Sequence, residues 1–188
     1  MSAQIRRAVP ADAAALRALQ RHLAEPAPAL LEAALSGVGE LYVAVADAPV
    51  GYLLAVDGGP LADDGGLLTD DGGLLADDGG PLTGDVDIAA VDSDHVDRVV
   101  AGGVGAAPTV HVAELVVAPR ARRRGHASAL LATLLGEHPG ATVTLTVAAD
   151  NTAARSLYER FGFEVERTLP EYFGDGPGLL LVRRPRAE

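Results

Sequence analysis

The chain has 188 residues, no cysteine and a formal net charge of −11 at pH 7. The length suits one domain with its own hydrophobic core, and the lack of cysteine excludes a disulfide framework and a thiolate metal site. Charges and a proline interrupt the N-terminal stretch, and no apolar run reaches the roughly 18 residues that a membrane-spanning helix needs. We therefore expect a soluble, cytoplasmic protein that does not bind membranes.

The negative charge is concentrated in one segment. Residues 57–97 contain 12 aspartates and neither arginine nor lysine, which leaves 14 of the 26 acidic residues against 15 basic residues elsewhere. All 15 basic residues are arginine. This arginine and aspartate bias resembles proteins from a salt-rich cytoplasm and indicates a possible halophilic source, although GC-rich coding also replaces lysine by arginine.

The first part of the chain predicts three strands and two helices. A strand is expected over residues 4–8, and Pro10 then opens a helix whose leucines recur at spacings of three and four. Two prolines end that helix, and a second short helix is expected over residues 29–35. The runs LYVAVAD and PVGYLLAVD, at residues 41–47 and 49–57, are rich in β-branched and aromatic residues and predict a hairpin.

A seven-residue repeat follows, within an acidic insertion that we place at residues 57–108. Its four units, GGPLADD, GGLLTDD, GGLLADD and GGPLTGD, cover residues 58–85. The period matches neither the roughly nine-residue units of calcium-binding β-rolls nor an EF-hand loop. Sparse leucine pairs and frequent glycines predict a flexible loop, with weak cation binding by the paired aspartates as the alternative.

Regular structure is expected again from Thr109 onward. The patterns predict strands over residues 109–117, 141–147, 163–167 and 179–183, and helices over residues 125–135 and 151–161. Strands and helices in this order predict an α/β or α+β domain, with a mixed, twisted sheet and helices on its faces.

The stretch VVAPRARRRGHASALLATLL, residues 116–135, predicts an anion site. A strand ends at Val117, Pro119 prevents its continuation, and a helix opens at Gly125 after an arginine-rich turn. The first amides of a helix lack partners within it and the helix dipole is positive there, so the backbone binds phosphate and the arginines add charge. A solvated turn is the alternative. The stretch lacks the lysine of a P-loop and the glycine triplet of a dinucleotide site.

A second motif, NTAARSLYERFGF, places Asn151, Ala154 and Tyr158 on one face of a helix. The pattern R-x-x-G-x-A followed by N-x-x-A-x-x-x-Y-x-x-x-G-F resembles the pairing that marks the GCN5-related N-acetyltransferase (GNAT) superfamily. The resemblance runs from about residue 4 to residue 183, with the repeat as an interruption. It implies one N-acetyltransferase domain over residues 1–188, with an α/β fold in which a mixed, twisted, largely antiparallel sheet is flanked by helices and splayed between its fourth and fifth strands.

The resemblance also implies where acetyl-CoA, the acyl donor, would lie. The strand end at 113–117 would carry a bulge and splay from the strand at 141–147, and the pantetheine arm would lie between them. Tyr158 would point its phenol at the sulfur, the amides from Arg123 to Ser128 would hold the pyrophosphate, and no metal is implied. The residues implied in cofactor binding are Leu115, Val116, Val117, Arg122, Arg123, Arg124, Gly125, His126, Ala127, Ser128 and Asn151.

The implied reaction is attack of a neutral amine on the thioester, which needs a proton donor and a proton acceptor. Tyr158 is the predicted donor to the leaving thiolate, because a tyrosine with a pKa of about 10 stays protonated at neutral pH; its alternative role is a core aromatic. Glu114 is the predicted base, and its alternative role is a carboxylate paired with an arginine. Simple strand alternation puts His111 on the face opposite Glu114. His126 is expected to contribute only its backbone amide.

The C-terminal stretch LPEYFGDGPGLLLV is similar to the tail of enzymes that acetylate the N-terminal alanine of a ribosomal protein. Those enzymes place a glutamate five residues before the asparagine of the helix motif, where this chain has Thr146. We expect a primary amine as acceptor, either a protein N-terminus or a small molecule, and a monomer or homodimer. A non-catalytic acyl-CoA-binding domain is the alternative. Nucleic-acid binding through the arginines is disfavoured, because no aromatic residues are interleaved with them and an acidic segment lies nearby.

Overall fold

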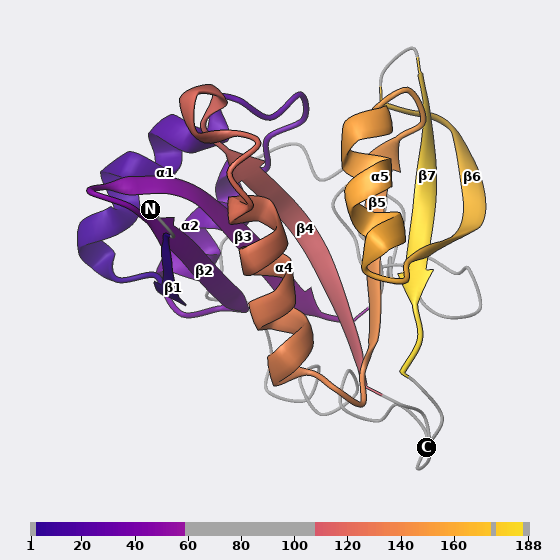
Figure 1. Cartoon of the computed structure of the whole chain (residues 1–188), viewed down its shortest axis with the longest axis horizontal. Helices are drawn as coiled ribbons and strands as arrows, with labels where there is room; N and C mark the ends of the chain where they lie inside the picture. Colours follow the sequence, from indigo (N-terminus) through magenta and orange to yellow (C-terminus); the bar gives the residue numbers. More distant parts are fainter. Residues whose placement is uncertain (1–2, 59–107, 174–175, 186–188) are drawn as a thin grey trace, which may run out of the picture.

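The computed structural model describes residues 3–58, 108–173 and 176–185, which form one sheet flanked by helices (Figure 1). The strands are β1 (Gln4–Arg7), β2 (Glu40–Val45), β3 (Pro49–Asp57), β4 (Thr109–Val117), β5 (Thr142–Ala148), β6 (Glu164–Phe173) and β7 (Gly176–Arg183). The helices are α1 (Ala13–Gln20), α2 (Pro28–Leu35), α4 (His126–Glu137) and α5 (Thr152–Arg160), with short 3-10 turns η1 (Pro10–Asp12) and η3 (Pro119–Ala121). The repeat at 58–85, apart from its first residue, lies outside the described residues.

The sheet has the strand order β1-β2-β3-β4-β5-β7-β6. Among these neighbours β4 and β5 are parallel and the other pairs are antiparallel. This confirms the predicted mixed, largely antiparallel sheet. The parallel pair is joined by α4, which is the kind of crossover that parallel strands require. In the described ranges, no helix is long and apolar enough to cross a membrane.

Helices cover both faces of the sheet. One face carries Glu114, which accepts a hydrogen bond from Gln20 at the end of α1. The opposite face carries Tyr42, whose hydroxyl lies 2.8 Å from a carboxylate oxygen of Glu137 at the end of α4. Figure 1 shows α5 in front of β5, on the same side of the sheet as α4. We call these two sides the α1 face and the α4 face.

A β-bulge interrupts β4 at Ala113. Leu54 of β3 is paired with Glu114, whereas the next residue, Ala55, is paired with Val112, so Ala113 has no partner on β3. A bulge bends the strand that carries it and increases its local twist. The bulge that the family resemblance implied for this strand is therefore present.

The strands β4 and β5 part directly beside the bulge. Their parallel pairing begins at Thr109 opposite Thr142 and ends at Val112 opposite Leu145. From residue 113 to residue 117, the edge of β4 that faces β5 therefore has no paired strand in the described part of the chain. This confirms the predicted splay between the fourth and fifth strands.

His111 and Glu114 lie on the same face of the sheet, and the expectation that they lie on opposite faces is wrong. Val56 is paired with His111 and Leu54 with Glu114. Directly paired residues share a face, and so do residues two apart on one strand, such as Leu54 and Val56. The extra residue in the bulge shifts the alternation of β4 by one, so that two residues three apart point the same way.

The C-terminal hairpin is longer than the sequence predicted. A strand was expected over residues 163–167, but β6 continues to Phe173 because residues 170–172 bulge out of the ladder with β7 before pairing resumes. Glu171 adopts a left-handed conformation, with φ 57°. The side chain of Tyr172 packs over Gly178, where an added Cβ would lie 3.2 Å from the ring.

Asp12 anchors the start of the first helix, and its ionisation is expected to make stability depend on pH. It accepts hydrogen bonds from Arg6 at 2.7 and 2.9 Å and from the Val9 amide at 2.9 Å. The Arg6 guanidinium lowers the pKa of Asp12 below its ordinary 3.8. A lowered pKa stabilises the fold above the unfolded value, and this contribution is lost as the pH falls through the folded value.

We expect Asp12→Asn to lower the free energy of unfolding by about 2 kcal/mol at neutral pH. The difference between wild type and variant should shrink below pH 3.8, the ordinary aspartate value. Urea unfolding at several pH values measures this. Exposed Glu166→Gln provides the control, because an ion pair at the surface contributes little. A difference that does not change with pH would contradict the assignment.

The insertion starts and ends at adjacent positions on the sheet. The Gly58 amide donates to the Thr109 carbonyl at 2.8 Å, beside the last pairs of β3 and β4. We expect a variant in which a short Asn-Gly turn replaces residues 59–107 to keep cooperative unfolding, because a hairpin turn closes antiparallel strands without help. Thermal melting checks this, and loss of a cooperative transition would show that the insertion is needed for folding.

Candidate active site

The parallel strands β4 and β5 end at the same edge of the sheet, and each leads into a helix. Helix α4 begins at His126 after β4, and helix α5 begins at Thr152 after β5. Figure 1 shows both helices starting at the end of the sheet where these strands have moved apart. In α/β folds, ligands bind outside the carboxyl ends of such strands.

The turn before α4 presents a row of free amides. Within the described residues, none of the amides from Arg123 to Ser128 donates a hydrogen bond, and the first that does is Ala129, which donates to Gly125 at 2.9 Å. Arg123 and Gly125 have φ values of 64° and 82°. Left-handed residues in a turn direct neighbouring amides into one concavity, and the helix dipole adds positive potential there. The turn therefore has the geometry of an anion site.

The arginines of this turn differ in what they contact. Arg122 folds back, and its Nε donates to the Val117 carbonyl at the end of β4, 3.2 Å away. Arg123 and Arg124 are exposed, and neither forms an ion pair with another described residue. The side chain of His126 is buried, so at the surface this residue presents its amide.

Asn151 caps α5. Its side-chain oxygen accepts the Ala154 amide at 3.1 Å, which satisfies one of the unpaired donors at the start of the helix. Arg155 donates to the Ala149 carbonyl at 2.9 Å and ties the same turn to the end of β5. The residue that should contact the cofactor arm is thus held in a fixed position.

Tyr158 is a buried phenol two residues before the end of α5. It is 7% exposed, and its ring packs edge-on against Phe163 with the centroids 5.8 Å apart. Its hydroxyl forms no hydrogen bond to another part of the described chain. Burial raises the pKa of Tyr158 to about 12, so the phenol remains a proton donor throughout the physiological range.

Glu114 lies at the centre of a buried hydrogen-bond network on the α1 face. Its Oε1 accepts hydrogen bonds from the Gln20 side chain at 2.9 Å and from the Ala27 amide at 2.8 Å, and its Oε2 accepts one from the Tyr52 hydroxyl at 2.7 Å. The network ties the connection between α1 and α2 to the sheet. Neither Gln20 nor Tyr52 was among the predicted site residues, and no local pattern marks Gln20, which is 94 positions away from Glu114.

A second polar group lies on the same face, where β4 and β5 are still paired. His111 is 3% exposed, and its Nδ1 lies 2.8 Å from the hydroxyl oxygen of Thr144, directly opposite on β5. Burial lowers the pKa of His111 to about 4, so the imidazole is neutral. Thr146, two residues further on β5, has a buried hydroxyl without a partner in the described ranges.

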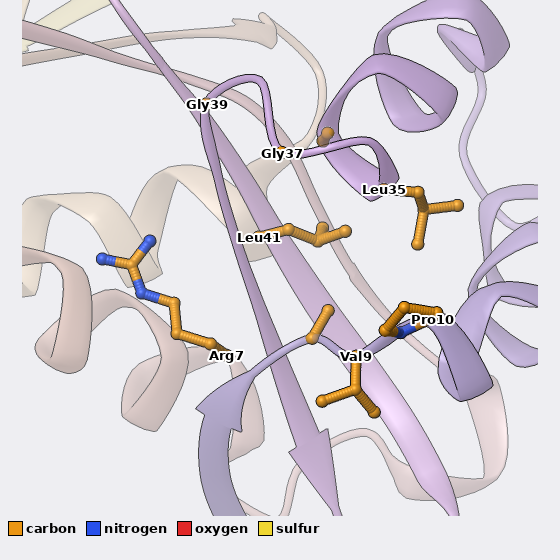
Figure 2. Close-up of a pocket in the computed structure, with 9 residues that line it drawn as sticks. Arg7, Val9, Pro10, Leu35, Gly37, Gly39 and Leu41 are labelled. Atoms are coloured by element: carbon orange, nitrogen blue, oxygen red, sulfur yellow. The ribbon is translucent and has the colours of Figure 1, made fainter.

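A small pocket of about 170 Å³ lies elsewhere, between the start of η1 and the turn from α2 to β2. Figure 2 shows that the Arg7 side chain on its rim is directed away from Leu35 and Pro10. That guanidinium contacts Glu40, Glu137 and the Tyr42 ring instead. The pocket contains none of the predicted site residues, so its size alone does not make it the active site.

The comparisons with known proteins agree with this fold. A model of the acetyltransferase (GNAT) family matches residues 20–163, and the chain therefore belongs to this family. A sequence search of curated proteins finds no match.

Several solved structures share the architecture. Arabidopsis thaliana NAA60 in complex with a bisubstrate analogue matches with a TM-score of 0.69 over 100% of both chains, at 18% identity. The ribosomal-protein-S18-alanine N-acetyltransferase from Escherichia coli matches with a TM-score of 0.62 over 99% of this chain and 96% of that chain, at 16% identity. Sequence identities this low show a common fold. They do not show which amine this chain acetylates.

Proposed function

We propose that the protein transfers the acetyl group of acetyl-CoA to a primary amine by direct attack of the amine on the thioester. The observation that carries this proposal is the row of unpaired amides from Arg123 to Ser128, beside two strands that part. Family membership supports acetyl transfer in general. Arg123 and Arg124 add charge for the phosphates of the donor.

The open edge of β4 suits the pantetheine arm. Leu115, Val116 and Val117 pair with β3 on one side, and no strand pairs with them on the β5 side within the described residues. An extended amide chain lying there completes the ladder like an added strand. This places the thioester near the bulge and leaves the diphosphate at the start of α4.

Tyr158 is proposed as the acid that protonates the departing thiolate. A thiolate leaves more readily when an acid donates a proton to it. Positioned acids of this kind contribute about 100-fold or more to the reaction rate. The phenol suits this role because burial raises its pKa to about 12. Asn151, fixed as the cap of the same helix, is proposed to orient the cofactor arm.

Glu114 is proposed to position the acceptor side of the site. The prediction that it takes the amine proton fits the structure less well, because three donors already occupy its oxygens. Those hydrogen bonds hold the connection between α1 and α2 over the α1 face. The acceptor then approaches from the α1 face while acetyl-CoA lies between β4 and β5.

The acceptor is proposed to be a primary amine, either a protein N-terminus or a small molecule. The S18-alanine enzyme, whose structure matches this chain, acts by its name on an N-terminal alanine. On this chain, Tyr172 lies over Gly178, which is paired with Ala148 at the end of β5. Ala148 shares the α1 face with Thr144 and His111, so this aromatic ring lies on the α1 face and borders the proposed acceptor site from the β7 side.

A panel assay tests the proposal. Wild-type protein, acetyl-CoA and a thiol reagent are combined with peptides beginning with Ala, Ser or Met, with spermidine, or with an aminoglycoside, at low and at molar salt. We expect acetyl-CoA binding in calorimetry and amine-dependent thiol release with at least one acceptor class. Binding without turnover on any amine would favour the alternative, a non-catalytic acyl-CoA-binding domain. Absence of binding would overturn the proposal.

A pair of glycine substitutions tests the role of the turn. Gly125 has φ 82° and Gly136 lies inside α4, and an added Cβ meets no atom within 4 Å at either position. We expect Gly125→Ala to weaken acetyl-CoA binding about ten-fold, because the turn of the free variant relaxes out of the left-handed conformation and restoring it on binding costs about 1–2 kcal/mol. Gly136→Ala should leave binding unchanged and add about 0.5–1 kcal/mol of stability. Equal acetyl-CoA affinities for the two variants in calorimetry would argue against the turn.

A further inference from the structure

The proposed transfer needs a group that takes the proton of the acceptor amine. At the position where the resembling ribosomal enzymes carry a glutamate, this chain has Thr146, which is not a base. The carboxylate of Glu114 on the α1 face is engaged by three donors. Among the described residues, the polar side chains next to the last pairs of β4 and β5 include those of His111, Thr144 and Thr146.

His111 is held in one orientation by its neighbour. Its Nδ1 lies 2.8 Å from the Thr144 hydroxyl, and this pairing is fixed by the strand register. In the tautomer with the proton on Nδ1, the N–H donates a hydrogen bond to the Thr144 oxygen and Nε2 keeps its lone pair. In the described ranges no group hydrogen-bonds to Nε2, so the side of the ring that faces away from Thr144 is available.

Thr146 supplies an independent observation at the same place. Its hydroxyl oxygen is buried and has no partner among the described residues, although leaving such a group unpaired costs about 1–3 kcal/mol. Thr146 is the first residue of β5 beyond the last pair with β4. It lies on the face of Thr144 and His111, about 7 Å further along the strand. A bridging water joins two polar atoms that lie up to about 5.6 Å apart, so a water bound to the Thr146 hydroxyl reaches the imidazole only where the ring extends toward it.

We propose that His111 is the base of the acetyl transfer, and that it takes the proton of the acceptor amine through a water bound to Thr146. This inference rests on the proposed function. The amine nitrogen bonds to the thioester carbon and gives one proton, through the water, to Nε2 of His111. The carbon–sulfur bond breaks, and the thiolate takes one proton from Tyr158. The imidazolium then loses its proton to solvent and the tyrosinate regains one from solvent.

Burial suits the imidazole to this task. A histidine whose pKa lies at about 4 is neutral whenever an amine is present in its free form. Bond formation turns the amine nitrogen into a cationic centre, which is a stronger acid than the free ammonium, so its proton passes to a base of low pKa, although less readily than to a base whose pKa is near the operating pH. The bulge at Ala113 brings His111 onto the face from which the amine approaches.

Kinetics of variants test the proposal, with the panel amine of highest turnover as the acceptor. We expect His111→Gln to lower kcat/KM for the amine by about 100-fold, with acetyl-CoA affinity within about two-fold of wild type. His111→Ala should recover at least ten-fold in rate when free imidazole is added, which a structural role does not predict. His138→Gln is the control, because His138 pairs with Glu40 at the far end of α4.

Thr146 provides a second pair of variants. Thr146→Val removes the hydroxyl at nearly constant volume and is expected to lower kcat/KM about ten-fold, whereas Thr146→Ser should stay near wild type. Wild-type rates in both His111→Gln and Thr146→Val would overturn this inference while leaving the proposed function intact. Wild-type protein that binds no acetyl-CoA overturns the proposed function instead. If His111→Gln does not fold, the Thr146 pair decides.

Discussion

Replacement of Tyr158 by phenylalanine should lower kcat by about 100-fold or more and leave the affinity for acetyl-CoA nearly unchanged. Phenylalanine keeps the edge-on contact with Phe163, whose centroid lies 5.8 Å from the Tyr158 ring, and removes only the proton that the thiolate needs. Stopped-assay kinetics give kcat, and calorimetry gives the affinity. A large effect on turnover with none on binding is the signature of a group that acts in the transition state.

The control for this substitution is Tyr42→Phe. Tyr42 is equally buried, and its hydroxyl contacts Glu40 and Glu137 away from the proposed site. This variant should lose some stability and keep its turnover. In wild type, loss of activity through deprotonation of Tyr158 should begin only as the pH approaches 12, because burial raises the pKa of this phenol to about 12. Unchanged kcat in Tyr158→Phe would remove the phenol from the mechanism.

Replacement of Glu114 by leucine should have the largest effect on stability, a loss of about 3–5 kcal/mol in the free energy of unfolding, because several buried donors lose their acceptor at about 1–3 kcal/mol each. The change leaves the Tyr52 hydroxyl, the Gln20 side chain and the Ala27 amide without their acceptor in a buried place. Unsatisfied buried donors carry the full cost of their desolvation. Urea denaturation measures the loss.

The same network predicts an effect on the acceptor amine. A milder variant, Glu114→Gln, should fold and raise KM for the amine more than it changes kcat, because the connection between α1 and α2 is held less firmly. If Glu114 is instead the base, kcat falls by about 100-fold at unchanged KM. Measuring kcat and KM of Glu114→Gln therefore distinguishes a positioning role from a role as base. Wild-type values of both constants would contradict both roles.

Much of the fold is predictable because its elements depend on local patterns. The hairpin of β2 and β3 follows from two apolar runs around Pro49, and the strand that ends at Val117 is followed by a proline that cannot extend it. The cap at Asn151 is likewise a local signal and is present in the structure. These features depend on neighbouring residues in the sequence and not on contacts with distant parts of the chain.

The part of the site on the α1 face is less predictable, because it depends on the register of the strand pairs and on contacts between residues far apart in the sequence. The extra residue Ala113 reverses the alternation of side chains between the two faces along β4. Nothing in the sequence TVHVAELVV marks Ala113 as the bulge. The partner of Glu114 is Gln20, from a helix 94 positions earlier. Pairing with an arginine was the alternative role for Glu114, whereas the structure satisfies this carboxylate with neutral donors.

In the proposed complex, the amides from Arg123 to Ser128 hold the diphosphate of acetyl-CoA at the start of α4. Titration of the ¹⁵N-labelled protein with CoA, followed by amide NMR spectra, tests it most directly. We expect these six amide signals to move as CoA is added up to one equivalent and not to move with pantetheine, which lacks the diphosphate. Equal responses to both compounds, or signals that stay in place with CoA, would contradict it.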